Sequence, residues 1–124
     1  MRSIIDELTS SLGAEKIAVD ATTLAAYAVD QAPVLDYQLP QAVVRAESVA
    51  DVQATVRACA ALGVALVARG AGTGVSGGAH ASAGCVVLTL EGMNRILDLN
   101  ADDETAVVEP GVINADLNLS LIHI

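Results

Sequence analysis

Hydrophobic residues recur at helical spacing near the start of the chain. The segment SIIDELTSSLG places its apolar residues on one face of a helix: Ile4, Ile5, Leu8 and Leu12. Ser3 and Asp6 have the spacing of a capping box at the start of this helix, and Gly13 is placed to end it. The pattern therefore predicts an amphipathic helix at the N-terminus.

A second, shorter helix is predicted over 21–29, with Asp20 or Thr22 as its N-terminal cap. The segment that follows it, DQAPVLDYQLPQ, contains Pro33 and Pro40. Two prolines within so short a stretch disfavour regular structure, so we expect an irregular connector here.

The next part of the chain has the pattern of a strand, a helix and a second strand. Short β-branched runs over 41–46 and 64–68 predict buried strands, and the stretch 48–62 between them has a capping box at Ser48 and Asp51. The predicted apolar stripe of the helix is Val52, Val56, Cys59 and Leu62. This order predicts a βαβ unit, in which the two strands run parallel and the crossover is right-handed.

Three further strands are predicted, over 85–90, 95–100 and 104–111. The last two are separated by an acidic turn around 100–103, and the residues of this turn together with Glu104 have the pattern of a solvated surface. The segment 113–118 reads as the first turn of a helix, with Asn114 as a cap.

Composition narrows the class of protein. The chain has 124 residues, a formal net charge of −9 and only two aromatic side chains. Nucleic acid favours a basic surface and stacking rings, so a nucleic-acid partner is not expected. The N-terminus lacks the features of a signal peptide and no apolar run is long enough to span a membrane, so we expect a cytoplasmic protein. Cys59 and Cys85 fit buried free thiols, and no cysteine or histidine cluster suggests a metal site.

The most informative stretch is VARGAGTGVSGGA, which follows the second predicted strand and carries half of the glycines of the chain: Gly70, Gly72, Gly74, Gly77 and Gly78. Successive glycines let backbone N–H groups turn inward and bind an anion. Thr73 and Ser76 add hydroxyl groups, Arg69 adds a positive charge, and the sequence from Arg69 to Leu90 contains no acid. This pattern favours a phosphate-binding loop over a plain surface turn.

Two common phosphate motifs do not apply. The residues from Gly72 to Gly77 match GxGxxG, but a Rossmann site needs a helix to begin within the loop. The few residues between Gly78 and the next predicted strand leave no room for a crossover helix. A Walker A loop needs a lysine, and Lys16 is the only lysine in the chain.

Three quoted segments resemble a known family: VALVARGAGTGVSGGA, CVVLTLEGMNRILDLN and TAVVEPGVINADLN. They are similar to the N-terminal part of the FAD-binding domain of FAD-linked oxidases of the vanillyl-alcohol oxidase or p-cresol methylhydroxylase (PCMH) type, in the branch of D-lactate dehydrogenase and the glycolate oxidase FAD subunit. The resemblance covers residues 39–118, and residues 1–38 fit a helical lead-in. It implies an α+β (α/β) fold: a βαβ subdomain with a short parallel sheet and flanking helices, and the first strands of a second, mostly antiparallel subdomain.

The resemblance also implies a cofactor and its site. FAD would lie between the two subdomains, with its pyrophosphate on the glycine-rich loop: Arg69, Gly70, Ala71, Gly72, Thr73, Gly74, Ser76, Gly77 and Gly78. Pro110 and Gly111 match a Pro-Gly-Val turn near the flavin. Some relatives link FAD covalently through a histidine where this chain has Thr73, so non-covalent FAD is expected. His80 is expected to be an exposed loop residue, with a flavin contact as the alternative, and His123 has no assigned role.

The resemblance implies oxidation of a small 2-hydroxy acid such as D-lactate or glycolate. It is also compatible with a partner subunit. The groups that bind the acid and take its proton come from later parts of such enzymes, so no catalytic residue is assigned, and Glu109 is interpreted as structural. The ending LSLIHI departs from the family, so we expect a fragment, inactive alone and weak in FAD binding, or a non-native tail at 119–124. Two alternatives remain: a non-catalytic nucleotide or anion module, and a flavin reductase of cell-wall precursor synthesis.

Overall fold

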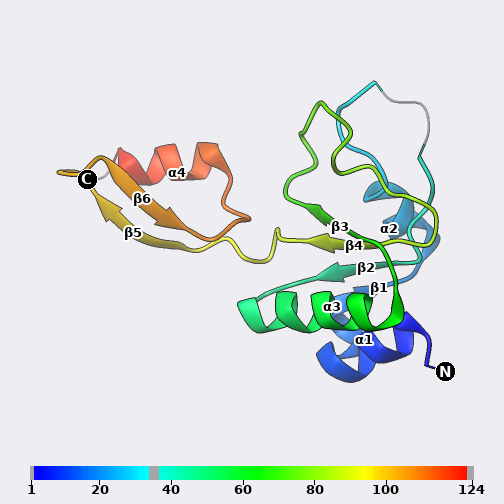
Figure 1. Ribbon diagram of the computed structural model, residues 1–124. Coiled ribbons are helices and arrows are strands. Elements are labelled where there is room, and N and C mark those ends of the chain that lie inside the picture. The colour runs from blue at the N-terminus through cyan, green and yellow to red at the C-terminus, as the bar shows by residue number, and fades with distance from the viewer. Residues whose placement is uncertain (1, 34–36, 123–124) are drawn as a thin grey trace.

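The computed structural model describes residues 2–33 and 37–122 of the chain. Residues 34–36 of the expected connector, and His123 with the last residue of the expected tail, lie outside the described residues. The chain forms a layered α/β unit from which a two-stranded hairpin and a helix project to one side (Figure 1). This arrangement confirms the expected α+β fold with a parallel sheet followed by antiparallel strands.

The helices and strands follow one another in an order close to the expected one. They are α1 (Ile4–Leu12), a short 3-10 helix (Ala14–Lys16), β1 (Ile17–Ala18), α2 (Ala21–Ala26), β2 (Ala42–Arg45), α3 (Val49–Leu62), β3 (Leu66–Arg69), β4 (Val86–Thr89), β5 (Ile96–Asn100), β6 (Thr105–Val108) and α4 (Asn114–Leu121). The second helix is three residues shorter than expected, and the last helix extends beyond the predicted 113–118.

The main sheet has the strand order β1-β2-β4-β3. Strands β2 and β3 both run parallel to β4, which lies between them, so the two strands of the predicted βαβ unit are parallel but not adjacent. Strand β1 adds an antiparallel edge through Ile17 and Ala18. A strand of two residues is too short to show an alternating pattern, which is why the sequence did not predict it.

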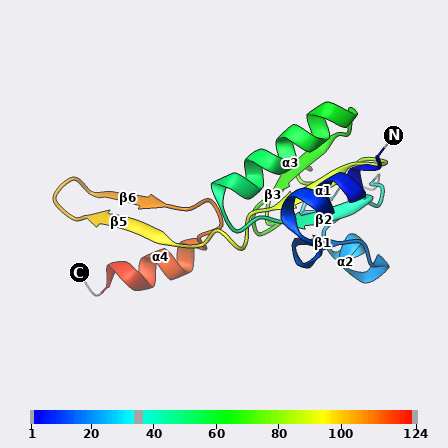
Figure 2. The ribbon, with the colours of Figure 1, turned by 90° about the horizontal axis from the view of Figure 1, so that it is seen from below.

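Two cores flank the sheet. Helices α1 and α3 pack side by side against one face, as both views show (Figure 2), and bury Leu8, Val44, Cys59, Val86 and Leu88 among other residues. The opposite face carries a smaller core: Ala28, Val43, Ala81, Cys85 and Val87. Burial of each valine or leucine contributes about 1.5–3 kcal/mol, so these layers fix the sheet from whose end the glycine-rich loop departs.

The buried face of α3 differs from the predicted stripe. Val56 is 46% exposed, whereas Cys59 is buried as expected. Asp51 and Thr55 are buried instead of Val56, because their polar atoms have partners. The Thr55 hydroxyl donates to the Asp51 carbonyl at 2.8 Å, and the Lys16 ammonium lies 2.9 Å from the Asp51 carboxylate. Pattern reading assigned the two polar residues to the surface because these partners are visible only in the fold.

The expected caps are mostly confirmed. The hydroxyls of Ser3 and Ser48 accept from the amides three residues on, at 3.1 and 3.2 Å, and Asp20 caps α2. The reciprocal half of the second capping box is different, because the Asp51 carboxylate accepts from the Glu47 amide at 3.0 Å. The expected cap at Asn114 is wrong: Ile113 precedes α4, and no side chain caps that helix.

The projecting part consists of β5, β6 and α4. Its turn is held by Asn100 and Asp103, whose side chain and backbone groups hydrogen-bond at 2.9 and 3.0 Å, and all four residues of β6 are exposed. The acidic turn is therefore the solvated surface that the sequence predicted. None of the helices formed by residues 2–33 and 37–122 is long and apolar enough to cross a membrane.

Candidate functional site

Two segments that are far apart in the sequence meet beyond the carboxyl end of β3. One is the glycine-rich loop, and the other is the segment 28–32 after α2; both lie on the side of the sheet away from α1 and α3 (Figure 1). The Gln31 amide donates to the Gly74 carbonyl at 2.9 Å, and the Ala81 amide donates to the Ala28 carbonyl at 2.8 Å. The segment 28–32 therefore contacts both arms of the loop, the outgoing arm (residues 70–76) and the returning arm (residues 77–81). Ligands of open α/β sheets bind at this end of the strands.

The loop encloses a concavity of 380 Å³. It is lined by Asp30, Ala68, Gly70, Ala71, Gly72, Thr73, Gly74, Val75, Ser76, Gly78 and Ala79. The fold thus brings together seven of the nine loop residues predicted from the sequence, and Arg69 and Gly77 lie outside the lining. Residues 70–85 form turns with no helix, as the short spacing predicted, so the Rossmann reading is excluded.

Backbone amides are the main donors that this loop offers. Within the described part of the chain, the N–H groups of residues 70–76 and of Gly78 have no backbone acceptor. The Ala79 amide instead donates to Asp30 Oδ2 at 3.4 Å, and the His80 amide donates to the Gly77 carbonyl at 3.1 Å. Backbone N–H groups that the protein does not pair require water or a ligand as a partner. Several such donors around one concavity can surround the oxygens of an anion.

The Arg69 side chain lies beneath the loop. Its Nη1 donates to the Val29 carbonyl at 2.6 Å, and its guanidinium lies 5.2 Å from the ring centroid of Tyr27. A Cβ on Gly72 would collide with this guanidinium, and Gly72 has a φ of +73°. Arg69 Nε is buried without a partner in the described residues. The positive charge therefore supports the underside of the loop, with one donor still unpaired.

Gly70 and Gly78 are glycines for a different reason. Neither has a positive φ, and a Cβ on either would meet no atom within 4 Å. The chain itself could hold a larger residue at both positions, yet both line the concavity. The absent side chains leave room for a ligand to approach the backbone. This space and the unpaired amides fit a diphosphate group.

Asp30 is the site residue that the sequence did not indicate. The loop sequence is free of acids, but the fold places the Asp30 carboxylate, 1% exposed, in the wall of the concavity. The Ala32 amide donates to it at 2.8 Å and is the main cause of a pKa below the ordinary value of 3.8. The separation of 49 residues between Asp30 and Ala79 hides the contact of Asp30 with the loop, and the only signal was an acid directly after the second predicted helix.

His80 is buried, which corrects the expectation of an exposed residue. Its side chain is 8% exposed, and Nδ1 lies 3.2 Å from Asp30 Oδ1, within ion-pair distance but not aligned as a hydrogen bond. The ring also lies 6.3 Å, centroid to centroid, from that of Tyr37. His80 therefore packs behind the loop beside Asp30.

Pro110 and Gly111 lie outside the concavity, where β6 leads toward α4. The Gly111 amide donates to the Met93 carbonyl at 2.7 Å, and a Cβ on Gly111 would collide with the Leu90 and Met93 backbone. The preceding Glu109 accepts from the Arg95 amide at 2.9 Å and from Arg95 Nε at 2.8 Å. Glu109 thus has the structural role that the sequence predicted, and a flavin contact by Pro110 or Gly111 stays a prediction.

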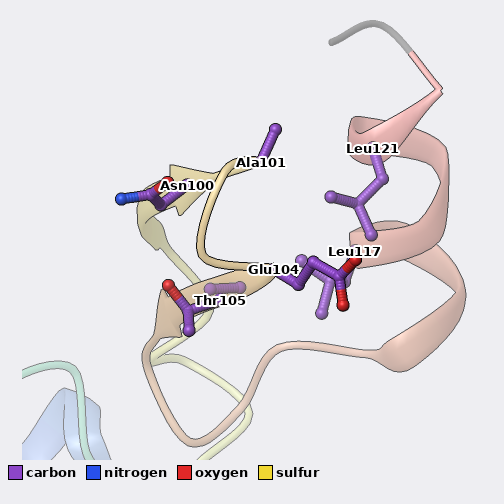
Figure 3. A pocket seen from close by; sticks show the side chains of 7 residues that line it. Asn100, Ala101, Glu104, Thr105, Leu117 and Leu121 are labelled. Atoms are coloured by element: carbon purple, nitrogen blue, oxygen red, sulfur yellow. The ribbon is translucent and has the colours of Figure 1, made fainter.

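A second concavity, of 390 Å³, lies between the hairpin and α4. Figure 3 shows Leu117 and Leu121 of α4 facing Ala101 and Glu104 in and beside the hairpin turn. Its lining is mainly apolar, and its one charged residue is an acid, so it does not suit an anion. The glycine-rich concavity is the better candidate for a phosphate site.

Comparisons with known proteins show the family to which the chain is similar. The model of the FAD binding domain family matches residues 40–123. D-2-hydroxyglutarate dehydrogenase of Stutzerimonas stutzeri (strain A1501) is 42% identical over 119 residues, which are 93% of this chain and 25% of that protein. A glycolate oxidase subunit, GlcD, of Bacillus subtilis (strain 168) is 35% identical over 92 residues, 73% of this chain and 19% of the relative.

A solved structure of p-cresol methylhydroxylase with substrate bound matches the fold with a TM-score of 0.83 and 26% identity. The match covers 97% of this chain and 24% of that one. The chain thus spans about a quarter, or less, of the length of each of these proteins. The resemblance to FAD-linked oxidases of the PCMH type, noted from the sequence, is confirmed.

Proposed function

Because the chain belongs to the FAD binding domain family, we propose that its glycine-rich loop binds the diphosphate of FAD. The donors are the unpaired amides of residues 70–76 and Gly78, supplemented by the hydroxyls of Thr73 and Ser76. Arg69 supports the loop from beneath and adds a positive charge. Backbone amides bind phosphate oxygens well because their dipoles are held in place by the fold.

The observation that carries this proposal is the open space at Gly70 and Gly78. Gly72 and Gly77 have positive φ, so the conformation of the chain accounts for them. Gly70 and Gly78 are required neither by φ nor by packing, and their missing side chains widen the concavity at its backbone. A ligand that must come close to the main chain explains them.

We also propose that FAD binds without a covalent bond. Thr73, at the position where some relatives use a histidine, has no imidazole nitrogen to form the link. His80 does not line the concavity, and its Nδ1 lies 3.2 Å from Asp30 Oδ1. The proposal predicts that acid precipitation of the flavin-loaded protein leaves all of the flavin in the supernatant.

The role we propose for the larger protein is oxidation of a 2-hydroxy acid, supported by relatives named D-2-hydroxyglutarate dehydrogenase and glycolate oxidase. Bound flavin supplies the acceptor for the hydride of the substrate. The residues of this chain orient that cofactor by its diphosphate, and none of them is assigned to substrate binding or proton transfer. Because the chain spans a quarter of the length of the Stutzerimonas stutzeri relative, we predict that by itself it binds FAD weakly.

Calorimetric titration of the chain with millimolar ADP tests the diphosphate proposal. Gly70→Ala and Gly78→Ala should weaken ADP binding by about threefold or more, because each methyl group separates phosphate oxygens from amide donors. Gly84→Ala is the control: Gly84 has a φ of +71° and lies outside the concavity, so its substitution should lower stability without changing ADP affinity. Unchanged affinity in both loop variants would contradict the proposal.

A further inference from the structure

A buried carboxylate in the wall of a phosphate site requires an explanation. The Asp30 carboxylate lines the same concavity as the amide-bearing loop. A negative charge there repels phosphate, and the side chain is almost completely excluded from water. Such an arrangement is unfavourable unless the carboxylate contributes something that offsets the repulsion.

The contacts of Asp30 show what it contributes. Its Oδ1 accepts from the Ala32 amide at 2.8 Å, which fixes the turn of its own segment, and its Oδ2 accepts from the Ala79 amide at 3.4 Å on the returning arm of the loop. His80 Nδ1 lies 3.2 Å from Oδ1. One side chain therefore contacts the returning arm at two positions, Ala79 and His80.

Asp30 also meets the outgoing arm of the loop. A Cβ on Gly74 would stand 3.4 Å from Asp30 Oδ2, so the carboxylate packs closely against the backbone there. The neighbouring Gln31 amide donates to the Gly74 carbonyl at 2.9 Å. Asp30 and Gln31 thus contact both arms of the loop.

We propose that Asp30 is a positioning residue for the proposed diphosphate site. Its carboxylate accepts from the Ala79 amide and packs against Gly74, and so holds the loop in the shape in which the amides of residues 70–76 and Gly78 have no backbone acceptor. His80 lies beside the carboxylate, outside the lining of the concavity. This inference rests on the proposed function of the loop, but the contacts that carry it are independent of any ligand.

The direction in which Asp30→Asn changes the affinity for pyrophosphate distinguishes a positioning residue from an acid that merely lies near the site. If Asp30 were merely an acid near the site, Asp30→Asn would remove repulsion and tighten binding of inorganic pyrophosphate. If Asp30 positions the loop, the same change weakens a charge-assisted hydrogen bond, and pyrophosphate binding falls by about tenfold. Asp103→Asn, an equal change of charge in the exposed hairpin turn, is the control and should leave the affinity unchanged.

A second measurement needs no ligand. In Asp30→Asn, amide hydrogen exchange followed by NMR should quicken by about tenfold at Ala79, because its acceptor loses its charge. Exchange in β2 and β4 should stay as in the wild type, which shows that the variant is folded. A general loss of stability would instead raise exchange in the strands as well, so a purely structural role is distinguishable.

The exchange and affinity measurements together support or overturn the proposed role of Asp30. Faster local exchange with weaker pyrophosphate binding supports the proposal. Unchanged exchange at Ala79, tighter pyrophosphate binding in Asp30→Asn, or exchange that rises equally in the strands overturns it. If wild-type loop amides do not respond to pyrophosphate although Asp30→Asn loosens the loop, the diphosphate function fails while the positioning of the loop by Asp30 is supported.

Discussion

The guanidinium of Arg69 occupies the space that a side chain at Gly72 would need. Arg69 is the last residue of β3 and Gly72 follows within the loop, so the chain turns back over its own arginine. The guanidinium is held by the Val29 carbonyl and by Tyr27. The shape of the loop at its first turn thus depends on one missing Cβ and on one arginine.

Gly72→Ala should destabilise the protein. A φ of +73° costs a residue with a Cβ about 1–2 kcal/mol, and the collision with Arg69 adds to this cost. Urea denaturation should therefore show a lower midpoint for the variant. Gly70→Ala has no such strain and should keep the wild-type midpoint. Equal midpoints for the wild type and Gly72→Ala would contradict the described packing of the arginine.

Acid should destabilise the chain through three carboxyl groups. The pKa of Asp30 is lowered mainly by the Ala32 amide, and that of Glu109 mainly by the Arg95 side chain. Burial alone would raise the pKa of Asp51, but the Lys16 ammonium and the Glu47 amide outweigh it and lower the pKa overall. In each case the unfolded chain binds protons more readily than the folded chain.

The stability that these groups supply is therefore complete above the ordinary carboxyl pKa and is lost as the pH falls through the folded-state values. Urea midpoints should be constant from neutral pH down to about pH 5 and decrease below it. Glu109→Gln should reduce the slope of this decrease. An unfolding midpoint that rises on acidification would show that these carboxylates are not stabilised by folding.

Cys59 and Cys85 should be unreactive toward thiol reagents in the folded chain. They are 1% and 0% exposed, and burial is the main cause of a raised pKa for the Cys59 thiol, so the reactive thiolate is scarce there. Labelling with a chromogenic disulfide at neutral pH should be slow in buffer and complete in urea. Rapid labelling without denaturant would mean that the two cores are open.

Gly111→Ala should weaken the junction between the sheet and the hairpin. The added Cβ would meet the carbonyls of Leu90 and Met93, which belong to the chain that leaves β4. Forced overpacking of this kind costs about 1–3 kcal/mol. Amide exchange should increase in β5, β6 and at Met93, and Gly78→Ala serves as a control without close contacts. Wild-type exchange in the hairpin would argue against this role for Gly111.

Local signals in the sequence predicted much of the fold. The confirmed predictions rest on residues only a few positions apart: the capping serines, the helical spacing of Leu8 and Leu12, and the β-branched runs that form strands. Other features depend on contacts across the fold: the position of β4 between β2 and β3, the burial of Thr55 and the antiparallel pairing of Ile17. No local pattern could reveal them.

The candidate site shows the same division. The glycines of the loop were recognisable because they are clustered, and the exclusion of a helix followed from spacing alone. Asp30 was missed because its partners Ala79 and His80 lie about 50 residues away, and His80 was assigned to the surface for the same reason. Arg69 was expected to add a positive charge to the loop, and its contacts with Val29 and Tyr27, which place it outside the lining of the concavity, could not be predicted from the sequence.

The most direct test of the central claim is an NMR titration of the ¹⁵N-labelled chain with ADP, in which each amide reports on its own surroundings. We expect the resonances of the amides of residues 70–76 and Gly78 to shift first and most strongly, while those around Leu117 and Leu121 stay in place. Shifts confined to the apolar concavity beside α4, or loop amides that do not move at saturating ADP, would contradict it.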